Sequence, residues 1–314
     1  MADVKLRTEV KPRGKICFPQ LLYTQPGYLR LQGNTDVLHF WAEQNESIVV
    51  HMAFHFEGIT AISLQKAPFG GLMSAATLSS QTLSTWWTQA EEELAKKGAK
   101  EIIIHQPPHI YGDDHAGFYT TAGFKKYRDR LYHAIAISPK KSWLEQASTM
   151  EKRKWKKCEK VGAKWVEVKG AERMNLVEKL LFWRSSDEKP ASLRIADIEN
   201  AMVELPKHYH VFGVKLNGEW VAATLAVLAS EMVLYHFIPA SHPDYKTYSP
   251  MVFLVEGLYR KAQEWQLNWI DLGASEVLGQ PKSSLIHFKE QIGGKPCHAY
   301  SWKKSVNWQG IRDL

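Results

Sequence analysis

Phe118-Tyr-Thr-Thr-Ala-Gly123-Phe124 and Phe288-Lys-Glu-Gln-Ile-Gly293-Gly294 share one layout, a phenylalanine followed five positions later by a glycine. Each glycine is expected to end a short helix, and a strand is expected after it. Working outward from both stretches gives the same order of elements in each half of the chain: hairpin, loop, long helix, short strand, short helix, glycine and strand. Such a repeated order indicates an internal duplication.

The first half of the chain shows this order clearly. Residues 47–65 predict a β-hairpin that turns at Glu57-Gly58. Residues 78–97 carry apolar side chains at helical spacing and stop at Gly98, which predicts a long helix. A short apolar strand at 101–105 follows.

The second half repeats the order and adds helices. Asn217-Gly218 is the strongest hairpin signal in the chain and joins strands at 208–215 and 219–228. A third strand is expected at 232–238, a helix from Pro250 to about 265, and a short strand at 269–271. Extra helices are expected at 141–161, 171–183 and 195–205. A strand gives way to a helix near 138–141, so the expected domains are 1–139 and 140–314.

Composition limits the class of protein. Of the 314 residues, 45% are hydrophobic, which excludes global disorder, and the formal net charge of +7 permits an anionic partner without requiring one. Three distant cysteines argue against a disulfide scaffold and a zinc site. The N-terminus lacks the apolar region of a signal peptide, and the longest apolar run, 220–229, is about half of a membrane span. The expected location is the cytoplasm, including the inner face of the membrane, with no integral membrane segment.

The stretch from Phe118 to Phe124 looks like the last helix-to-strand corner of the GNAT acyltransferase fold, commonly FYxxxGF. The resemblance implies an α+β fold of two tandem GNAT-like domains, each a mixed central sheet flanked by helices. GNAT enzymes hold the CoA pyrophosphate on a glycine-rich loop at a helix N-terminus. The chain has Pro-Phe-Gly-Gly-Leu-Met-Ser-Ala at 68–75 and Asp-Tyr-Lys-Thr-Tyr-Ser-Pro at 244–250 instead. Acetyl-CoA is therefore not indicated, and the first domain is expected to be structural.

A second resemblance rests on the later half. Its motifs are Tyr235, Tyr248-Ser249-Pro250, Glu256, Trp269-Ile-Asp271-Leu-Gly273 and Phe288-Lys289-Glu-Gln-Ile-Gly293-Gly294. Together with the duplicated layout, they resemble the Fem-type (FemABX) peptidyltransferases, which move an amino acid from aminoacyl-tRNA to the peptide of a cell-wall precursor. The resemblance covers most of the chain. It implies an aminoacyltransferase of peptidoglycan biogenesis, with charged tRNA as a partner and a nucleotide- or lipid-linked peptide as the acceptor.

Three residues are candidates for the catalytic role. The resemblance implies that Lys289 contacts a phosphate or ester oxygen and that Phe288 stacks on a base. A lysine ammonium can stabilise developing negative charge, although Lys289 could equally be a solvated helix lysine. Asp271, at a strand end before Gly273, either orients the substrate amine or caps the next turn. Attack by an amine on an activated ester needs no covalent enzyme nucleophile.

Five residues are candidates for substrate binding. Tyr248 and Ser249 precede a helix, where Ser249 either caps the helix or helps to bind an anion. Tyr235 either packs in its strand or belongs to the site that the resemblance implies. Arg153 and Lys154 lie in the densest basic run, which is either a solvated helix or a face that contacts a diphosphate or the tRNA backbone.

Neither a cofactor nor a metal is expected. The histidines and aspartates between His105 and His115 match no metal-ligand spacing. Two other functions remain open. The region 141–205, broken by Pro190, is too short for the long two-helix arm of many aminoacyl-tRNA users, so the donor could instead be an acyl thioester of an N-acyltransferase. The chain could also be a non-catalytic module that binds a nucleotide-linked ligand or RNA.

Overall fold

The computed structural model describes residues 4–33, 36–64, 66–76, 78–185, 194–277 and 279–306. The chain divides into a first unit, Met1–Arg130 with His298–Leu314, and a second unit, Leu131–Cys297. This division differs from the expected domains 1–139 and 140–314. The last strand, β16 (Lys295–Ser305), pairs through Ser301 with His105, so most of it belongs to the first unit.

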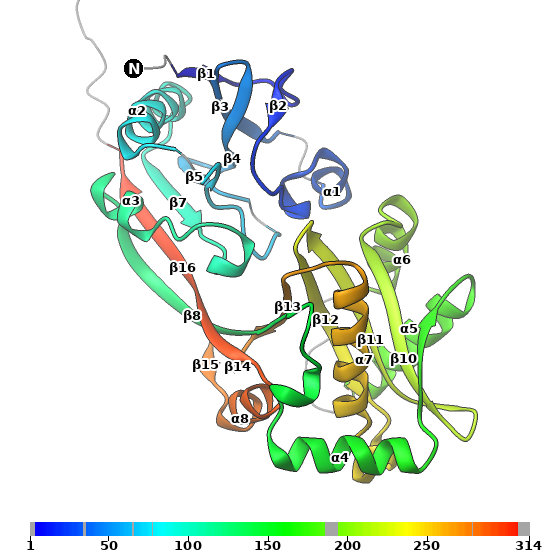
Figure 1. The fold of residues 1–314 in the computed structure, drawn as a ribbon. Helices are drawn as coiled ribbons and strands as arrows, with labels where there is room; N and C mark the ends of the chain where they lie inside the picture. Colours follow the sequence, from blue (N-terminus) through cyan, green and yellow to red (C-terminus); the bar gives the residue numbers. More distant parts are fainter. Residues whose placement is uncertain are drawn as a thin grey trace, which may run out of the picture. The chain divides into compact units, whose positions relative to one another are not determined.

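The first unit contains a mixed sheet (Figure 1). Strands β3, β4 and β5 run antiparallel, β5 and β7 run parallel, and β7 and β16 run antiparallel. The other elements, in chain order, are β1 (Lys5–Arg7), β2 (Lys15–Ile16), η1 (Leu22–Thr24), α1 (Pro26–Leu31), β3 (Leu38–Gln44), β4 (Ser47–Glu57), β5 (Thr60–Ile62), β6 (Met73–Ser74), α2 (Ser80–Lys96), β7 (Glu101–His105), η2 (His109–Tyr111), α3 (Ala116–Thr121) and the start of β8 (Lys125–Ala136).

The second unit contains a mixed sheet in the order β8-β13-β12-β11-β10-β9, in which only β12 and β13 pair in parallel among the described strands. Its elements after β8 are η3 (Trp143–Glu145), α4 (Thr149–Lys160), β9 (Lys164–Val168), α5 (Glu172–Ser185), α6 (Ile195–Glu204), β10 (Tyr209–Leu216), β11 (Glu219–Ser230), β12 (Val233–Ser241), η4 (Pro243–Tyr248), α7 (Pro250–Glu264), β13 (Trp269–Ala274), β14 (Glu276–Val277), β15 (Gln280–Pro281) and α8 (Ser283–Gln291).

The predicted duplication is confirmed by this order of elements. In both units a long helix, α2 or α7, leads to a strand that pairs in parallel with the last strand of the hairpin region, and a short helix and a strand follow. Local contacts fix the start of α2 and the predicted hairpin turn. Ser79 caps α2 by accepting a hydrogen bond from the Thr82 amide, and Asn217 and Gly218 turn the β10–β11 hairpin with positive φ angles of 52° and 87°.

Helices cover both faces of the sheet in the second unit. A Cβ atom added at Gly213 of β10 would lie 3.0 Å from Leu176 of α5, so this residue faces α5. Its neighbours Phe212 and Val214 point the other way, into the core that α7 supplies with residues such as Leu258. Alternation along each strand therefore tells which helix a side chain faces.

Gly257 is where α7 packs closest to the sheet, because a Cβ atom there would lie 2.0 Å from Cδ1 of Trp165. Replacing glycine by alanine within a helix normally stabilises it by up to about 1 kcal/mol. At this position the added methyl must displace the indole, so we expect Gly257→Ala to lower the free energy of unfolding by about 2 kcal/mol. Urea unfolding measures the change. Gly117→Ala in α3, where no atom lies within 4 Å, is the matched control and is expected to be neutral or stabilising.

Candidate functional site

A cavity opens in the second unit where two parallel strands separate. Strands β12 and β13 pair over Val233–Tyr235 and Trp269–Asp271. Beyond these residues β12 continues along β11, and β13 continues along β8, with which it pairs from Trp269 onward. The cavity has a volume of about 930 Å³. Its wall is formed by Arg184, Tyr235, His236, Phe237, Pro239, Ala240, Ser241, Lys246, Met251, Leu272, Gly273, Ala274, Glu276, Val277, Ser284, Leu285, Phe288, Lys289 and Ile292.

Lys289 is held by its surroundings and is not a solvated helix lysine. Its side chain belongs to a residue that is only 5% exposed, and its Nζ donates hydrogen bonds to the carbonyl oxygens of Gly273 (2.7 Å) and Ala274 (2.8 Å) and to Oγ of Ser275 (3.1 Å). These three bonds match the three hydrogens of an ammonium group. Lys289 therefore ties α8 to the end of β13 and places a fixed positive charge at the cavity wall.

Ser275 extends this hydrogen-bond network to β8. Its Oγ lies 2.7 Å from Nδ1 of His133, and both side chains are fully buried. Since the Ser275 hydroxyl accepts from Lys289, it can donate its own hydrogen to His133. The positions of Lys289 and of the turn after β13 therefore depend on one another.

Asp271 caps the turn, one of the two roles considered for it from the sequence. The residue is fully buried, and its Oδ1 accepts a hydrogen bond from the amide of Gly273 at 2.6 Å. Gly273 has a φ of 76°, which suits glycine. Tyr235, the register partner of Asp271, is half-buried and lines the cavity, and its Oη would lie 3.3 Å from a Cβ atom added at Gly273. Glycine thus allows the tyrosine ring to lie against the turn.

Tyr248 is the last residue of η4, and Ser249 lies between η4 and α7. Neither is part of the cavity wall, although Lys246 and Met251 near them are. Ser249 adopts a left-handed conformation (φ 54°), and its side chain makes no capping hydrogen bond. The ring of Tyr248 packs against the core, with Nζ of Lys157 5.6 Å from its centre. The predicted capping bond of Ser249 is therefore not formed.

Arg153 and Lys154 lie on α4, and neither lines the cavity. Lys154 donates to Oε1 of the buried Glu151 at 2.6 Å, whereas Arg153 is exposed. The structure thus brings together Lys289, Phe288, Asp271 and Tyr235 out of the eight predicted residues. A catalytic or substrate-binding role for any of the eight stays a prediction.

The sequence analysis missed several polar residues of the wall. Arg184, Lys246 and Glu276 supply charges, and His236 supplies an imidazole that is only 6% exposed. No motif marks these residues, because they come from four separate elements or loops. The one local hint was the position of His236 next to Tyr235 in a strand.

The buried cysteines of this unit are poor nucleophiles. Burial raises the pKa of Cys158 to about 11. Burial and the negative charge of Asp271 raise the pKa of Cys297 to about 12, although Lys289 acts in the opposite direction. Both thiols stay protonated near neutral pH, so neither supplies the thiolate that covalent catalysis needs. Within the described ranges, no group of three or more His, Cys, Asp and Glu residues could hold a metal ion.

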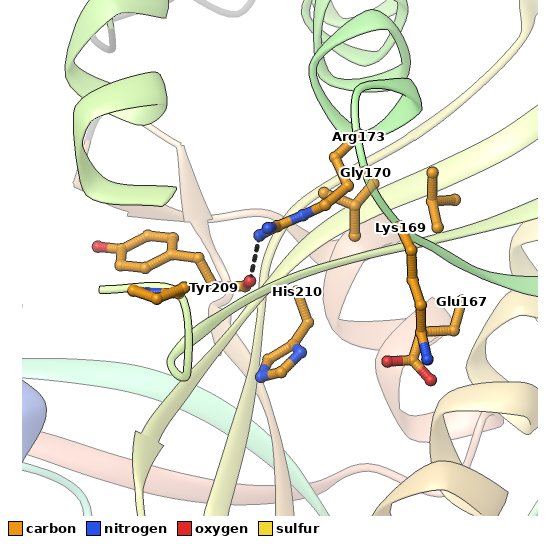
Figure 2. A pocket seen from close by; sticks show the side chains of 9 residues that line it. Glu167, Lys169, Gly170, Arg173, Tyr209 and His210 are labelled. Carbon is orange, nitrogen blue, oxygen red and sulfur yellow. Dashed lines mark hydrogen bonds between the residues drawn. The ribbon is translucent and has the colours of Figure 1, made fainter. Parts of the chain in front are cut away.

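Figure 2 shows a second, smaller hollow of about 150 Å³, where β9, the start of α5 and β10 meet. Arg173 reaches across it, and its Nη2 donates to the carbonyl oxygen of Tyr209 at 2.5 Å. Nε2 of His210 lies 3.1 Å from the carbonyl oxygen of Lys207. None of the predicted site residues lines this hollow, and its volume is far below the roughly 930 Å³ of the larger cavity. The larger cavity is therefore the candidate site.

The corresponding place in the first unit is filled by the chain. The amide of Gly70 donates to the carbonyl oxygen of His105, and the amide of Leu72 donates to Oη of Tyr119 at 2.9 Å. Tyr119 is fully buried, and burial raises the pKa of its hydroxyl. The tyrosine of the first repeated stretch thus holds the loop that follows β5, and a structural role for this unit stays a prediction.

Comparison with known proteins agrees with this architecture. Residues 149–281, less than half of the chain, match the acetyltransferase (GNAT) domain family, and no curated protein sequence is significantly similar to the chain. The structure of FemX superimposes with a TM-score of 0.72 and 13% identity over 92% of this chain and 93% of that chain. The C-terminal domain of a putative lysylphosphatidylglycerol synthetase from Agrobacterium fabrum gives 0.55 and 11% over 81% and 80%. L-PGS from Bacillus licheniformis gives 0.56 and 12% over 87% and 86%.

At these identities the likeness establishes the fold. The chain has an α+β, tandem GNAT fold that FemX also has, as the two resemblances predicted. In the part of the chain that the structure describes, no helix combines the length and the apolar character needed to cross a membrane.

Proposed function

We propose that this tandem GNAT protein is a transferase that moves an aminoacyl or acyl group onto an amine acceptor, with the cavity of the second unit as its active site. The observation that carries the proposal is the cavity between β12 and β13, with the fixed ammonium of Lys289 and the ring of Phe288 in its wall. A volume of about 930 Å³ has room for an acyl group together with part of its carrier.

The charges of the wall suit an anionic carrier. Arg184, Lys246 and Lys289 are basic, against the single carboxylate of Glu276 among the wall residues. Such an excess of positive charge attracts phosphate groups of a nucleotide or of tRNA. Phe288 is half-buried, so part of its ring is available for stacking on a base.

The donor in this proposal is an aminoacyl-tRNA. One structural neighbour is named as a putative lysylphosphatidylglycerol synthetase, and so concerns an aminoacyl group. The resemblance to Fem-type enzymes adds the acceptor, the peptide of a nucleotide- or lipid-linked cell-wall precursor in the cytoplasm or at the inner face of the membrane. Lys289 would act on the reacting ester mainly through its charge, because its hydrogens already have acceptors.

Transfer of a labelled amino acid from a charged-tRNA pool to a nucleotide-linked muropeptide tests the proposal directly. A parallel reaction supplies a pool of labelled acyl-CoA thioesters to the same acceptor. Product from charged tRNA supports the proposal. Product only from the thioester would show that the donor is an acyl thioester and not an aminoacyl-tRNA. Binding of the muropeptide without transfer from either donor would show a binding module and would refute the proposed activity.

Phe288→Ala should weaken binding of the donor more than it slows the chemical step. Loss of one stacked base costs on the order of 1–3 kcal/mol, so we expect KM for charged tRNA to rise by about 10-fold or more with a small change in kcat. Phe182→Ala is the matched control, since Phe182 lies on α5, is 74% exposed and does not line the cavity. Equal kinetic constants for the two variants would remove Phe288 from the binding site.

A further inference from the structure

His236 is a buried polar group in the cavity wall. The residue is 6% exposed and lies on β12 between Tyr235 and Ile238, where the register of this strand against β11 shifts. Nδ1 of His236 is enclosed and has no hydrogen-bond partner among the residues that the structure describes. A buried imidazole nitrogen without a partner costs free energy, and such groups need an explanation.

The surroundings keep this imidazole neutral. The cavity wall near it includes the apolar side chains of Met251, Leu272 and Ile292. Burial and the positive charge of Lys289 lower the pKa of His236 to about 3. The ring is therefore uncharged near neutral pH and is too weak a base to accept a proton from an ammonium group. The remaining ionisable wall residues are Arg184, Tyr235, Lys246 and Glu276.

The position of the ring proton follows from the enclosure of Nδ1. A buried N–H without an acceptor is rarer in proteins than a buried lone pair without a donor, so we assign the proton to Nε2. A neutral imidazole can then donate one hydrogen bond, and Nε2 is the ring atom with which it can do so. Since Nδ1 is enclosed, Nε2 is the nitrogen left for a molecule in the cavity.

We infer that His236 is a catalytic residue whose Nε2–H donates a hydrogen bond to the carbonyl oxygen of the acyl group during transfer. This inference rests on the proposed function and goes beyond it, because it names a hydrogen-bond donor for the reacting atom. A preorganised donor stabilises the oxygen most when negative charge develops on it. The nearby charge of Lys289 acts on the same oxygen, although its hydrogens are bound to protein acceptors.

The reaction balances without a protein side chain as the final acceptor of a proton. The lone pair of the acceptor amine forms the new C–N bond, and the π electrons of the carbonyl move to its oxygen, which His236 stabilises. The carbonyl then re-forms, and the bond to the leaving oxygen of the ester breaks with its electron pair. The leaving oxygen takes the proton that the amine nitrogen loses.

Three substitutions of His236 test the inference in the full chain, with the transfer assay described above. His236→Ala should lower kcat by about 100-fold, the size typical for loss of one such donor. The amide nitrogen of glutamine lies near the place of Nε2 and that of asparagine near Nδ1. We therefore expect His236→Gln to keep at least a tenth of the wild-type kcat and His236→Asn to be as impaired as His236→Ala. His287→Ala, an exposed histidine of α8, is the control.

A substrate-independent measurement keeps the inference testable if a variant fails to fold. Nuclear magnetic resonance of protein labelled with ¹⁵N-histidine should show His236 neutral, with the proton on Nε2, from pH 5.5 to 8.5. Titration of this ring in that range, or a proton on Nδ1, would overturn the inference. So would wild-type-like kcat in both His236→Ala and His236→Asn while wild type is active. An inactive wild type with either donor refutes the proposed function itself.

Discussion

Lys289→Ala is expected to lower the rate of transfer by about 100-fold or more and to destabilise the second unit at the same time. The rate falls because the fixed charge at the cavity wall is lost. Stability falls because the carbonyl oxygens of Gly273 and Ala274 and the Ser275 hydroxyl lose a charged donor inside the protein. We expect a loss of about 3 kcal/mol, or a fall in Tm of roughly 6–12 °C for a unit of this size.

Two further variants separate charge from packing at Lys289. Lys289→Met keeps an apolar stem of similar length and removes the ammonium. It should therefore leave a smaller void than Lys289→Ala leaves, but it should lose as much activity. Lys282→Ala, an exposed lysine next to the start of the same helix, should change Tm and activity little. Differential scanning calorimetry and transfer assays at a temperature well below the lowest Tm give both quantities. A Lys289→Ala protein with unchanged Tm would contradict the hydrogen-bond network, and one with near-normal turnover would remove Lys289 from the mechanism.

Asp271→Ala is expected to have the second large effect. The substitution leaves the buried amide of Gly273 without its acceptor and removes a buried negative charge that acts on the thiol of Cys297 together with Lys289. Losing one partner of a buried charged network costs about 3–5 kcal/mol. We therefore expect the free energy of unfolding, measured in urea, to fall by about that amount. Transfer should also decrease, since the turn from Gly273 to Ser275 holds the ammonium of Lys289.

Asp271→Asn distinguishes the hydrogen bond from the charge. The asparagine side chain keeps an oxygen that can accept from the amide of Gly273, but it carries no charge. An intermediate loss of stability is expected. If Asp271→Asn is as destabilised as Asp271→Ala, the charge dominates, whereas two wild-type-like variants would contradict the capping role that the structure shows.

Some features of the fold follow from short-range patterns in the sequence. Apolar spacing that stops at Gly98 specified α2, and Asn217-Gly218 specified the β10–β11 turn, because periodicity and the backbone preferences of turn residues act within a few residues. The duplicated order of elements was visible for the same reason. It predicted two mixed sheets flanked by helices.

Other features needed contacts between distant parts of the chain. The acceptors of Lys289 lie 14 to 16 residues away on a different element, so the sequence left open whether this lysine is solvated or buried. The left-handed conformation of Ser249 removed a capping bond that its position before a helix suggested. Tyr248, Ser249, Arg153 and Lys154 lie outside the cavity wall, and no local pattern could show this.

The sequence by itself determined helices such as α2 and α7, the β10–β11 hairpin and the order of elements that occurs twice, since these depend on periodicity and on turn residues. Only the tertiary structure decided which strand the chain's end pairs with, where β12 and β13 separate, and that His236 and Lys289 line one cavity. Strand pairing and the burial of polar groups depend on partners that are far apart in sequence. Their free energies are set by packing and desolvation in the folded protein, which no single segment encodes.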